Sequence, residues 1–396
     1  HVIYGESGVG KSELINLLAD ERQSKSILFN IEKTNRQKDI KVILQNPDLQ
    51  IISNTIENEL AFSLECNSND TKLIRHHLEE AEAKLLFSVN TNRHPVTLSG
   101  GEKELLNIST TFLLPNSVIL IDDALSFLSD QMKRKVMEQF FFKQQNKNVI
   151  IWLTSDESDL NYGDTKWKLT PSEFSKIRSL QLNKLPKASL QKGEINLEID
   201  ILNFHYDSKN LIFKDFSESI KNFRCLGIIG NNGCGKSTLA SLLLELEKPI
   251  SGSIKLNCTK LKDIEIGYLD QFPEKLLGIM TLEDFVHLLI VNGKLDSSQL
   301  NEIYSQLQEN NIAWENIKDI LALDLSWTNL RIALIIILSN CNYDLLILDE
   351  PTFGMGSQQK LNLYSHFIRY LEVKHLILIS HDHRYISSIC DSIIKL

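Results

Sequence analysis

The stretch that decides the fold runs from residue 230 to residue 238 and reads Gly230-Asn231-Asn232-Gly233-Cys234-Gly235-Lys236-Ser237-Thr238. An apolar run, residues 225–229, precedes it, and an apolar helical pattern, residues 239–244, follows it. Strand, glycine turn and helix are the context in which the pattern Gly-x4-Gly-Lys-Ser/Thr forms a phosphate loop. The glycines let backbone N–H groups curl around a polyphosphate, and the helix N-terminus adds its positive dipole end. We expect Lys236 to reach the outer phosphates and the Ser237 hydroxyl to bind Mg²⁺.

The same pattern occurs near the start of the chain, as Gly5-Glu6-Ser7-Gly8-Val9-Gly10-Lys11-Ser12. The alternative interpretation, a glycine turn with a Lys-Ser pair by chance, is weakened because the pattern appears twice.

Length and composition indicate a globular protein of two domains. The chain has 396 residues, 42% of them apolar and 23% charged, which suits two ordinary cores. A net charge of −9 without a basic stripe argues against nucleic acid as a partner. The six cysteines form no C-x-x-C pair, so we expect reduced thiols and a cytoplasmic protein. No apolar run is long enough for a membrane span, and we expect no signal peptide. The sequence begins inside a strand, so we expect the first domain to lack its leading strands.

Matching positions in the two halves are separated by a nearly constant interval, which indicates two copies of one domain. The interval is 225 to 227 residues for four pairs: Lys11 and Lys236, Gln45 and Gln271, Leu98 and Leu325, Asp122 and Asp349. We place the first domain at residues 1–171, a polar linker at 172–194 and the second domain at 195–396.

The fold class is α/β, with a mostly parallel sheet core and a helical subdomain in each copy. Residues 117–121 and 343–348 are continuous apolar runs, as expected of strands that are covered on both faces. Residues 282–293 and 297–310 are predicted helices of the second copy.

The order of these motifs resembles that of the ATP-binding cassette ATPases over essentially the whole chain. That family carries a phosphate loop, a Q-loop glutamine, an LSGGQ signature, an acidic Walker B end and a switch histidine. Its cassettes pair head to tail, so that each ATP lies between the phosphate loop of one and the signature of the other. The resemblance therefore implies two tandem P-loop nucleotide-binding domains of this type, with ATP and Mg²⁺ as ligands.

The resemblance gives the second cassette a full hydrolytic set. Glu350 would deprotonate the attacking water and His381 would contact the γ-phosphate. Asp349 and Gln271 would bind Mg²⁺, and Tyr206 would stack on adenine. The alternatives, a solvated acidic pair and a surface histidine, fit less well because apolar strands precede both positions.

The signature opposite this site would be that of the first cassette. Its Ser99 hydroxyl and the amides of Gly100 and Gly101 would cap a helix that we expect to begin at Lys103.

The other composite site departs from the family pattern. The first cassette has Asp123 where the second has Glu350, and Ser155 where it has His381. The signature facing it keeps Ser326, but Trp327 and Thr328 replace the two glycines, and we expect Thr328 to tolerate positive φ poorly. Losing one transition-state contact typically costs about 10²–10³ in rate, so this site should hold ATP without hydrolysing it quickly.

The composite site that contains the first phosphate loop keeps several residues of the family pattern. Its phosphate loop is intact, and Ser12, Gln45 and Asp122 are placed to bind Mg²⁺. Random drift would scatter substitutions over both composite sites, whereas the observed substitutions would all surround the same ATP. The aspartate that the family places after each Walker B segment is Ser129 in one copy and Gly356 in the other, and the sequence offers no physical account of that change.

Four segments look like those of the ATPases of energy-coupling-factor importers, which take up vitamins or transition-metal ions; these are residues 45–50, 55–62, 271–275 and 349–354. The resemblance implies a cytoplasmic motor on the inner face of the cell membrane. Its partners would be a transmembrane scaffold, whose coupling helices enter grooves beside the Q-loops, and a substrate-binding membrane subunit. Apolar residues of the middle region either line such grooves or are plain core.

Two alternatives stay open. One is a soluble twin-cassette ATPase that acts on the ribosome or on nucleic acid. Residues 380–385 resemble the matching segment of such proteins. The short linker and the acidic balance count against it. The other is the motor of an exporter, which the cassettes alone do not distinguish from an importer.

Overall fold

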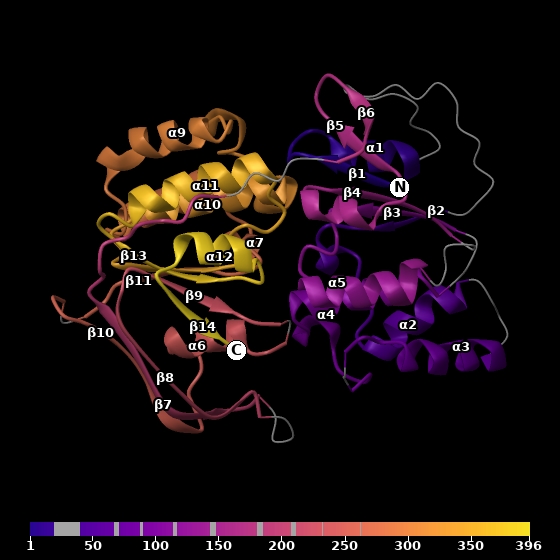
Figure 1. Ribbon diagram of the computed structural model, residues 1–396, viewed down its shortest axis with the longest axis horizontal. Helices are drawn as coiled ribbons and strands as arrows, with labels where there is room; N and C mark the ends of the chain where they lie inside the picture. The colour runs from indigo at the N-terminus through magenta and orange to yellow at the C-terminus, as the bar shows by residue number, and fades with distance from the viewer. Residues whose placement is uncertain are drawn as a thin grey trace. The chain divides into compact units, whose positions relative to one another are not determined.

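A computed structural model describes residues 1–19, 40–66, 71–87, 90–113, 117–142, 148–179, 185–206, 211–231, 233–261 and 263–396. The chain forms two compact units, one of His1–Leu182 with Gly354–Ser357, the other of Asn183–Phe353 with Gln358–Leu396. Figure 1 draws the first in indigo to magenta and the second mainly in red to yellow. Both are α/β units with a parallel sheet, as the sequence predicts.

The first unit is built on a six-stranded sheet with the spatial order β2-β3-β4-β1-β5-β6. Its strands are β1 (Val2–Gly5), β2 (Ile40–Ile43), β3 (Val118–Asp122), β4 (Val149–Thr154), β5 (Lys166–Leu169) and β6 (Phe174–Ile177). All neighbours are parallel except β5 and β6. Because β6 pairs with β5, the sheet includes residues of the predicted linker, and the first unit extends past residue 171 to Leu182.

Strand β3 is apolar up to its last residue, Asp122, because both faces of the sheet are covered. Leu120 shares a buried cluster with Ile15 of the first helix, whereas Ile119 and Ile121 share another with Leu105. The helices of this unit are α1 (Lys11–Ala19), α2 (Ile56–Glu65), α3 (Thr71–Ala83), α4 (Gly100–Thr111) and α5 (Asp130–Val136), which a π-helical turn (Met137–Phe142) extends. Short 3-10 turns lie at Pro47–Leu49, Pro95–Thr97 and Glu157–Tyr162.

The second unit contains two sheets. An antiparallel sheet has the order β10-β7-β8, with β7 (Ile195–Phe204), β8 (Phe213–Phe223) and β10 (Ser251–Cys258). A parallel sheet has the order β11-β12-β13-β9-β14, with β9 (Cys225–Ile229), β11 (Ile266–Leu269), β12 (Leu345–Asp349), β13 (His375–Ile379) and β14 (Ser392–Lys395). Helix α6 (Lys236–Leu243) shares one hydrophobic cluster with strands of both sheets.

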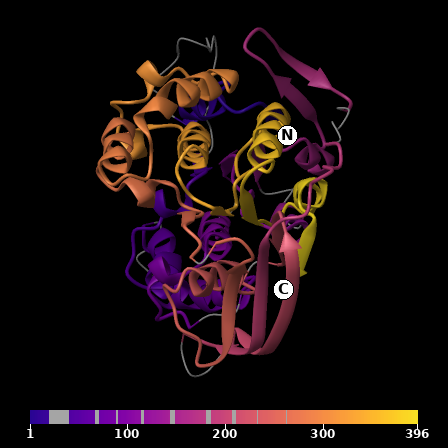
Figure 2. The same cartoon turned by 90° about the vertical axis from the view of Figure 1, so that its left-hand side faces the viewer.

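The remaining helices of this unit are α7 (Glu274–Leu277), α8 (Leu282–Val291), α9 (Leu300–Glu309), α10 (Trp327–Ser339), α11 (Ser357–Tyr370) and α12 (His383–Ile389), with 3-10 turns at Ser297–Gln299, Trp314–Asn316 and Ala322–Asp324. The two predicted helices are confirmed, as α8 and as a 3-10 turn followed by α9. In Figure 2 the helices of residues 282–339, drawn in orange, form a group apart from the pink strands of the antiparallel sheet. Within the described ranges, no helix combines the length and the apolar character that a membrane span requires.

Candidate nucleotide site

Both phosphate loops lie at the carboxyl end of a central parallel strand, β1 in the first unit and β9 in the second. Lys236 Nζ donates to the carbonyl oxygens of Gly230 at 3.0 Å and Asn231 at 3.1 Å. Lys11 makes the same two bonds, at 2.9 and 3.2 Å, to the first two carbonyls of its own loop. Each lysine thus closes its loop into a ring, with the ammonium group at the mouth of the next helix.

The loops need glycine at two positions each. Gly233 and Gly235 have φ of 76° and 99°, and Gly8 and Gly10 have φ of 84° and 96°. This left-handed conformation is accessible to glycine at little cost, and it turns successive N–H groups toward a common centre, as anion-binding loops do. Of the predicted loop residues, Asn232 lies outside the described residues.

The loop serines meet the Walker B aspartates. Ser237 Oγ donates to Asp349 Oδ2 at 2.6 Å, and Ser12 hydrogen-bonds Asp122. Burial, followed by the charge of Glu350, raises the pKa of Asp349 to about 7. Burial also raises the pKa of Asp122 to about 6, and its Oδ1 is buried with no hydrogen-bond partner among the residues that the structure describes. A hydroxyl and a carboxylate are the oxygen ligands that Mg²⁺ prefers, so these residues fit a divalent cation, whose charge would favour the ionised carboxylates.

The Q-loop glutamines follow strands that lie next to the Walker B strands. Gln45 comes after β2, which pairs with β3, and Gln271 comes after β11, which pairs with β12. Each glutamine is therefore at the same sheet edge as the aspartate of its unit.

Glu350 is held in a strained and fully bonded position. Its φ is 49°, its N–H donates to Ile379 O at 2.8 Å, and its carboxylate accepts from His381 N at 3.0 Å and Ser380 Oγ at 2.8 Å. His381 Nδ1 lies 2.9 Å from Oε2. Burial alone would raise the pKa of Glu350, but the attraction of His381, its hydrogen bonds and the charge of Lys236 outweigh burial and lower it. Ser380 was not among the predicted site residues, although its place between a buried strand and His381 was a signal.

Asp123 occupies the matching position of the first unit. Its φ is also 49°, and its N–H donates to Leu153 O at 2.8 Å. Oδ1 accepts from Ser155 N at 2.8 Å and from Ser155 Oγ at 2.9 Å, while Oδ2 lies 3.3 Å from Lys11 Nζ. Positions 123 and 155 thus correspond to 350 and 381 in backbone geometry as well as in sequence order.

The signature serines are helix caps. Ser99 and Glu102 form a capping box on α4, with the Ser99 N–H donating to Glu102 Oε2 at 2.9 Å. Ser326 Oγ accepts from Asn329 N at 3.3 Å at the start of α10. Each serine satisfies a backbone donor that the helix end leaves free.

Two expectations about these turns were wrong. Helix α4 begins at Gly100 and not at Lys103. Trp327 and Thr328 form the first turn of α10 and have helical backbones, so positive φ is not required there. The replacement of the glycines therefore changes the bulk at the helix start and leaves its conformation unaltered.

Two other predicted positions have local explanations. Ser129 caps α5, since its side chain accepts from Met132 N at 3.3 Å. Tyr206 is 59% exposed, and its ring lies edge-on to that of Phe204, with the centroids 5.0 Å apart.

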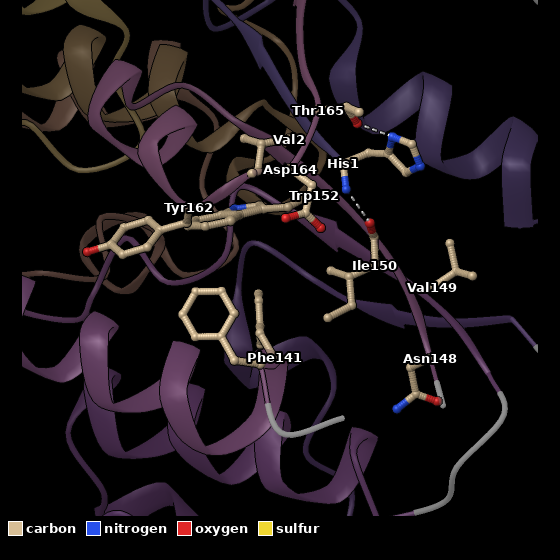
Figure 3. Close-up of a pocket in the computed structure, with 12 residues that line it drawn as sticks. His1, Val2, Phe141, Asn148, Val149, Ile150, Trp152, Tyr162, Asp164 and Thr165 are labelled. Atoms are coloured by element: carbon tan, nitrogen blue, oxygen red, sulfur yellow. Dashed lines mark hydrogen bonds between the residues drawn. The ribbon is translucent and has the colours of Figure 1, made fainter. Parts of the chain in front are cut away.

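A cavity of about 400 Å³ lies elsewhere in the first unit, near the starts of β1 and β4. Figure 3 shows Phe141, Trp152 and Tyr162 around it, with His1 bonded to Ile150 O. The phosphate loop follows the opposite, carboxyl end of β1, so this cavity is separate from the nucleotide site.

Comparisons with known proteins agree with this geometry. The family model described as "ABC transporter" matches residues 1–126 and 213–353. A Bacillus anthracis protein provisionally named ABC transporter ATP-binding protein is 24% identical, over 90% of this chain and 77% of its own length. The Bacillus subtilis protein provisionally named HMP/thiamine import ATP-binding protein YkoD is 25% identical, over 100% and 84%.

Solved structures show the same fold. Ribosome-bound archaeal Pelota and ABCE1 match with a TM-score of 0.71 at 19% identity, over 100% of this chain and 72% of that one. The RNase-L inhibitor matches with a TM-score of 0.62 at 17% identity, over 100% and 82%. The family model covers more than half of the chain, in two stretches that each contain a Walker B aspartate, so this protein is a tandem-cassette ATPase and belongs to the ABC transporter family.

Proposed function

We propose that this protein is the ATP-hydrolysing motor of an energy-coupling-factor type importer of a vitamin or metal-ion micronutrient. It would act in the cytoplasm on the inner face of the cell membrane, bound to a transmembrane scaffold that carries a substrate-binding subunit. Its two cassettes would pair within the chain, with one hydrolytic and one degenerate composite ATP site.

At the hydrolytic site, Lys236 and the loop amides would bind the phosphates, and Ser99 to Gly101 of the first cassette would complete the pocket. Glu350 would accept the proton of the attacking water, since its lowered pKa keeps it ionised at neutral pH. His381 would contact the γ-phosphate. Mg²⁺, bound by Ser237 and Asp349, would supply charge stabilisation to the phosphates.

One observation carries the transporter assignment: exposed apolar side chains recur at matching positions of the two units, in the segment between the Q-loop glutamine and the signature. Three pairs are 226 or 227 residues apart: Ile52 and Ile279, Phe62 and Leu288, Val96 and Leu323. Their exposed fractions are 63% and 93%, 45% and 43%, and 68% and 69%. Single exposed apolar residues are ordinary, but a set that recurs at matching positions of both units supports two matching docking surfaces.

Local bonding also brings these segments together in each unit. In the first, Glu57 N donates to Thr91 O at 3.0 Å, and in the second, Glu283 N donates to Lys318 O at 3.1 Å. A β-bridge further links Thr281 to Leu321. We infer that each surface receives an amphipathic cytoplasmic helix of the scaffold, whose apolar face would cover these side chains. ATP-driven closure would then move the helices, and hydrolysis would reset them.

The test is membrane association of the full chain expressed in its own host. Ile279→Glu with Leu323→Glu should shift the protein from the membrane fraction to the supernatant and lose a co-purifying multi-span protein. ATP binding should be unchanged. Val373→Glu is the matched control, since Val373 is 74% exposed in the turn between α11 and β13. Sedimentation with ribosomes, or membrane retention that the double variant does not alter, would contradict the proposal.

A further inference from the structure

The indole of Trp327 packs inside its own cassette. Its Nε1 donates to Glu274 Oε2 at 2.6 Å. Its ring centroid lies 5.8 Å from that of Phe272 and 5.1 Å from that of Phe353, the latter edge-on. Phe272 directly follows Gln271 in the sequence, and Phe353 comes three residues after Glu350. The residue that replaces a signature glycine thus contacts the two loops that bear the proposed hydrolytic residues of the same unit.

One turn further along α10, Arg331 bonds the same two loops. It is 1% exposed. Its guanidinium group donates to Gln271 O and, at 3.2 Å, to Phe353 O. The guanidinium carbon lies 5.2 Å from the Trp327 centroid and 5.1 Å from the Phe353 centroid. A buried cation is costly unless it is paired, and here two carbonyls and two aromatic rings stabilise it.

The first unit has a different arrangement at the matching place. Glu104 stands there, 227 residues earlier, and its carboxylate accepts from Leu125 N. Lys103 pairs with Asp48 at 2.6 Å, and Asn107 Nδ2 donates to Pro47 O at 3.0 Å. The signature helix is therefore bonded to the Q-loop segment in both units, but in the second unit a single aromatic and guanidinium cluster makes the connection.

We propose that Trp327 and Arg331 are positioning residues for ATP hydrolysis at the Glu350 site. They hold the backbone of Gln271 against the loop that follows Glu350. The position of the glutamine side chain relative to the Glu350 carboxylate is thereby fixed. The inference rests on the proposed function, in which Glu350 carries hydrolysis. It also gives Trp327 a role in its own cassette, where the signature motif alone would assign it only to the opposite site.

The test begins with Arg331→Lys, which keeps the charge but loses the two-pronged donor. We expect turnover of saturating Mg-ATP to fall by about 10- to 100-fold, the range for a misplaced catalytic group. Binding of a fluorescent ATP analogue should stay within about twofold, because the phosphate loop is untouched. Arg369→Lys is the matched control, since Arg369 is half exposed and pairs with Glu309 on the surface; its turnover should equal that of the wild type.

A double-mutant cycle separates positioning from a structural role. If Arg331 acts through Gln271, Arg331→Lys should lower turnover little further in a Gln271→Ala background. Losses that multiply in the double variant would overturn the inference.

Trp327→Gly provides an independent variant. The substitution restores the signature glycine. If Trp327 acted only at the composite site that its signature faces, ATP turnover would stay unchanged or rise. We expect instead a loss of about tenfold or more, with Trp327→Phe, which keeps a ring, in between. Unchanged turnover in both would overturn the inference. If Glu350→Gln also turns over normally, the proposed function itself fails; if Glu350→Gln is inactive, only the positioning role fails.

Discussion

Glu350 and Asp123 share one backbone conformation, with φ of 49° at each, although they lie in different units and differ in length by a methylene. Each donates its N–H to a carbonyl at the end of the neighbouring strand: Glu350 to Ile379 O and Asp123 to Leu153 O, both at 2.8 Å. Left-handed backbone is unfavourable for residues with a side chain and clusters at functional sites. The loop therefore imposes this conformation on both residues, and the difference between the units lies in how far the carboxylate reaches.

Replacing Glu350 with Gln should stop most ATP turnover. The amide keeps an oxygen that can accept from His381 N but cannot take a proton from water. We expect a loss of at least about 100-fold in steady-state hydrolysis of Mg-ATP, with binding of a fluorescent ATP analogue retained. Substantial residual turnover would show that Glu350 is not the base.

Asp123→Asn is the matched change in the first unit. Because Asp123 is held by Ser155 and Lys11, we expect turnover within about twofold of the wild type under the same assay. A decrease as large as that of Glu350→Gln would mean that both sites hydrolyse ATP.

The two left-handed glycines of the second phosphate loop should respond differently to alanine. A Cβ at Gly233 meets no described atom within 4 Å, whereas a Cβ at Gly235 comes within 2.6 Å of Ile212 Cγ2 and 3.0 Å of Phe213 Cζ. Gly233→Ala should cost about 1–2 kcal/mol in the free energy of unfolding, from backbone strain alone. Gly235→Ala adds a steric clash, worth roughly 1–3 kcal/mol more. Urea unfolding of the nucleotide-free protein measures both, and equal losses would contradict the clash.

Glu104 makes the stability of the protein depend on pH. Burial raises its pKa to about 8 from an ordinary value of 4.5. The folded state therefore holds this proton more tightly than the unfolded state, so the free energy of unfolding decreases as the pH rises from 4.5 through about 8. Gln at this position cannot titrate, and its oxygen can still accept from Leu125 N. We expect Glu104→Gln to gain roughly 1–3 kcal/mol over the wild type between pH 5 and pH 8.5.

Urea unfolding at pH 5, 6.5 and 8.5 measures this difference. Glu138→Gln, at an exposed position, is the control and should run parallel to the wild type. If the free energy of unfolding of Glu104→Gln also changes with pH as that of the wild type does, the buried carboxyl does not contribute to the pH dependence.

The sequence predicts what depends on local pattern. The phosphate loops, the buried strands β3 and β12 and the helices α8 and α9 follow from glycine spacing and apolar periodicity. Strand β6 lies within the predicted linker, because Phe174–Ile177 has only four residues and does not alternate apolar and polar side chains, so no local pattern indicates a strand there. The inward packing of Trp327 depends on Glu274, 53 residues away, and no local pattern encodes such a contact. Arg331 was not among the predicted site residues, although a charged residue within the apolar run of α10 was a signal.

The exchange of Glu104 for Arg331 also limits how the halves can be engineered. A symmetric enzyme made by transplanting the five signature residues would leave the guanidinium group of Arg331 under a helix start without its indole, and a carboxyl cannot simply take its place against two carbonyls. The two halves have diverged in the side-chain contacts of the signature helix as well as in their motifs. A working hybrid would therefore have to exchange each signature helix together with the loops that it contacts.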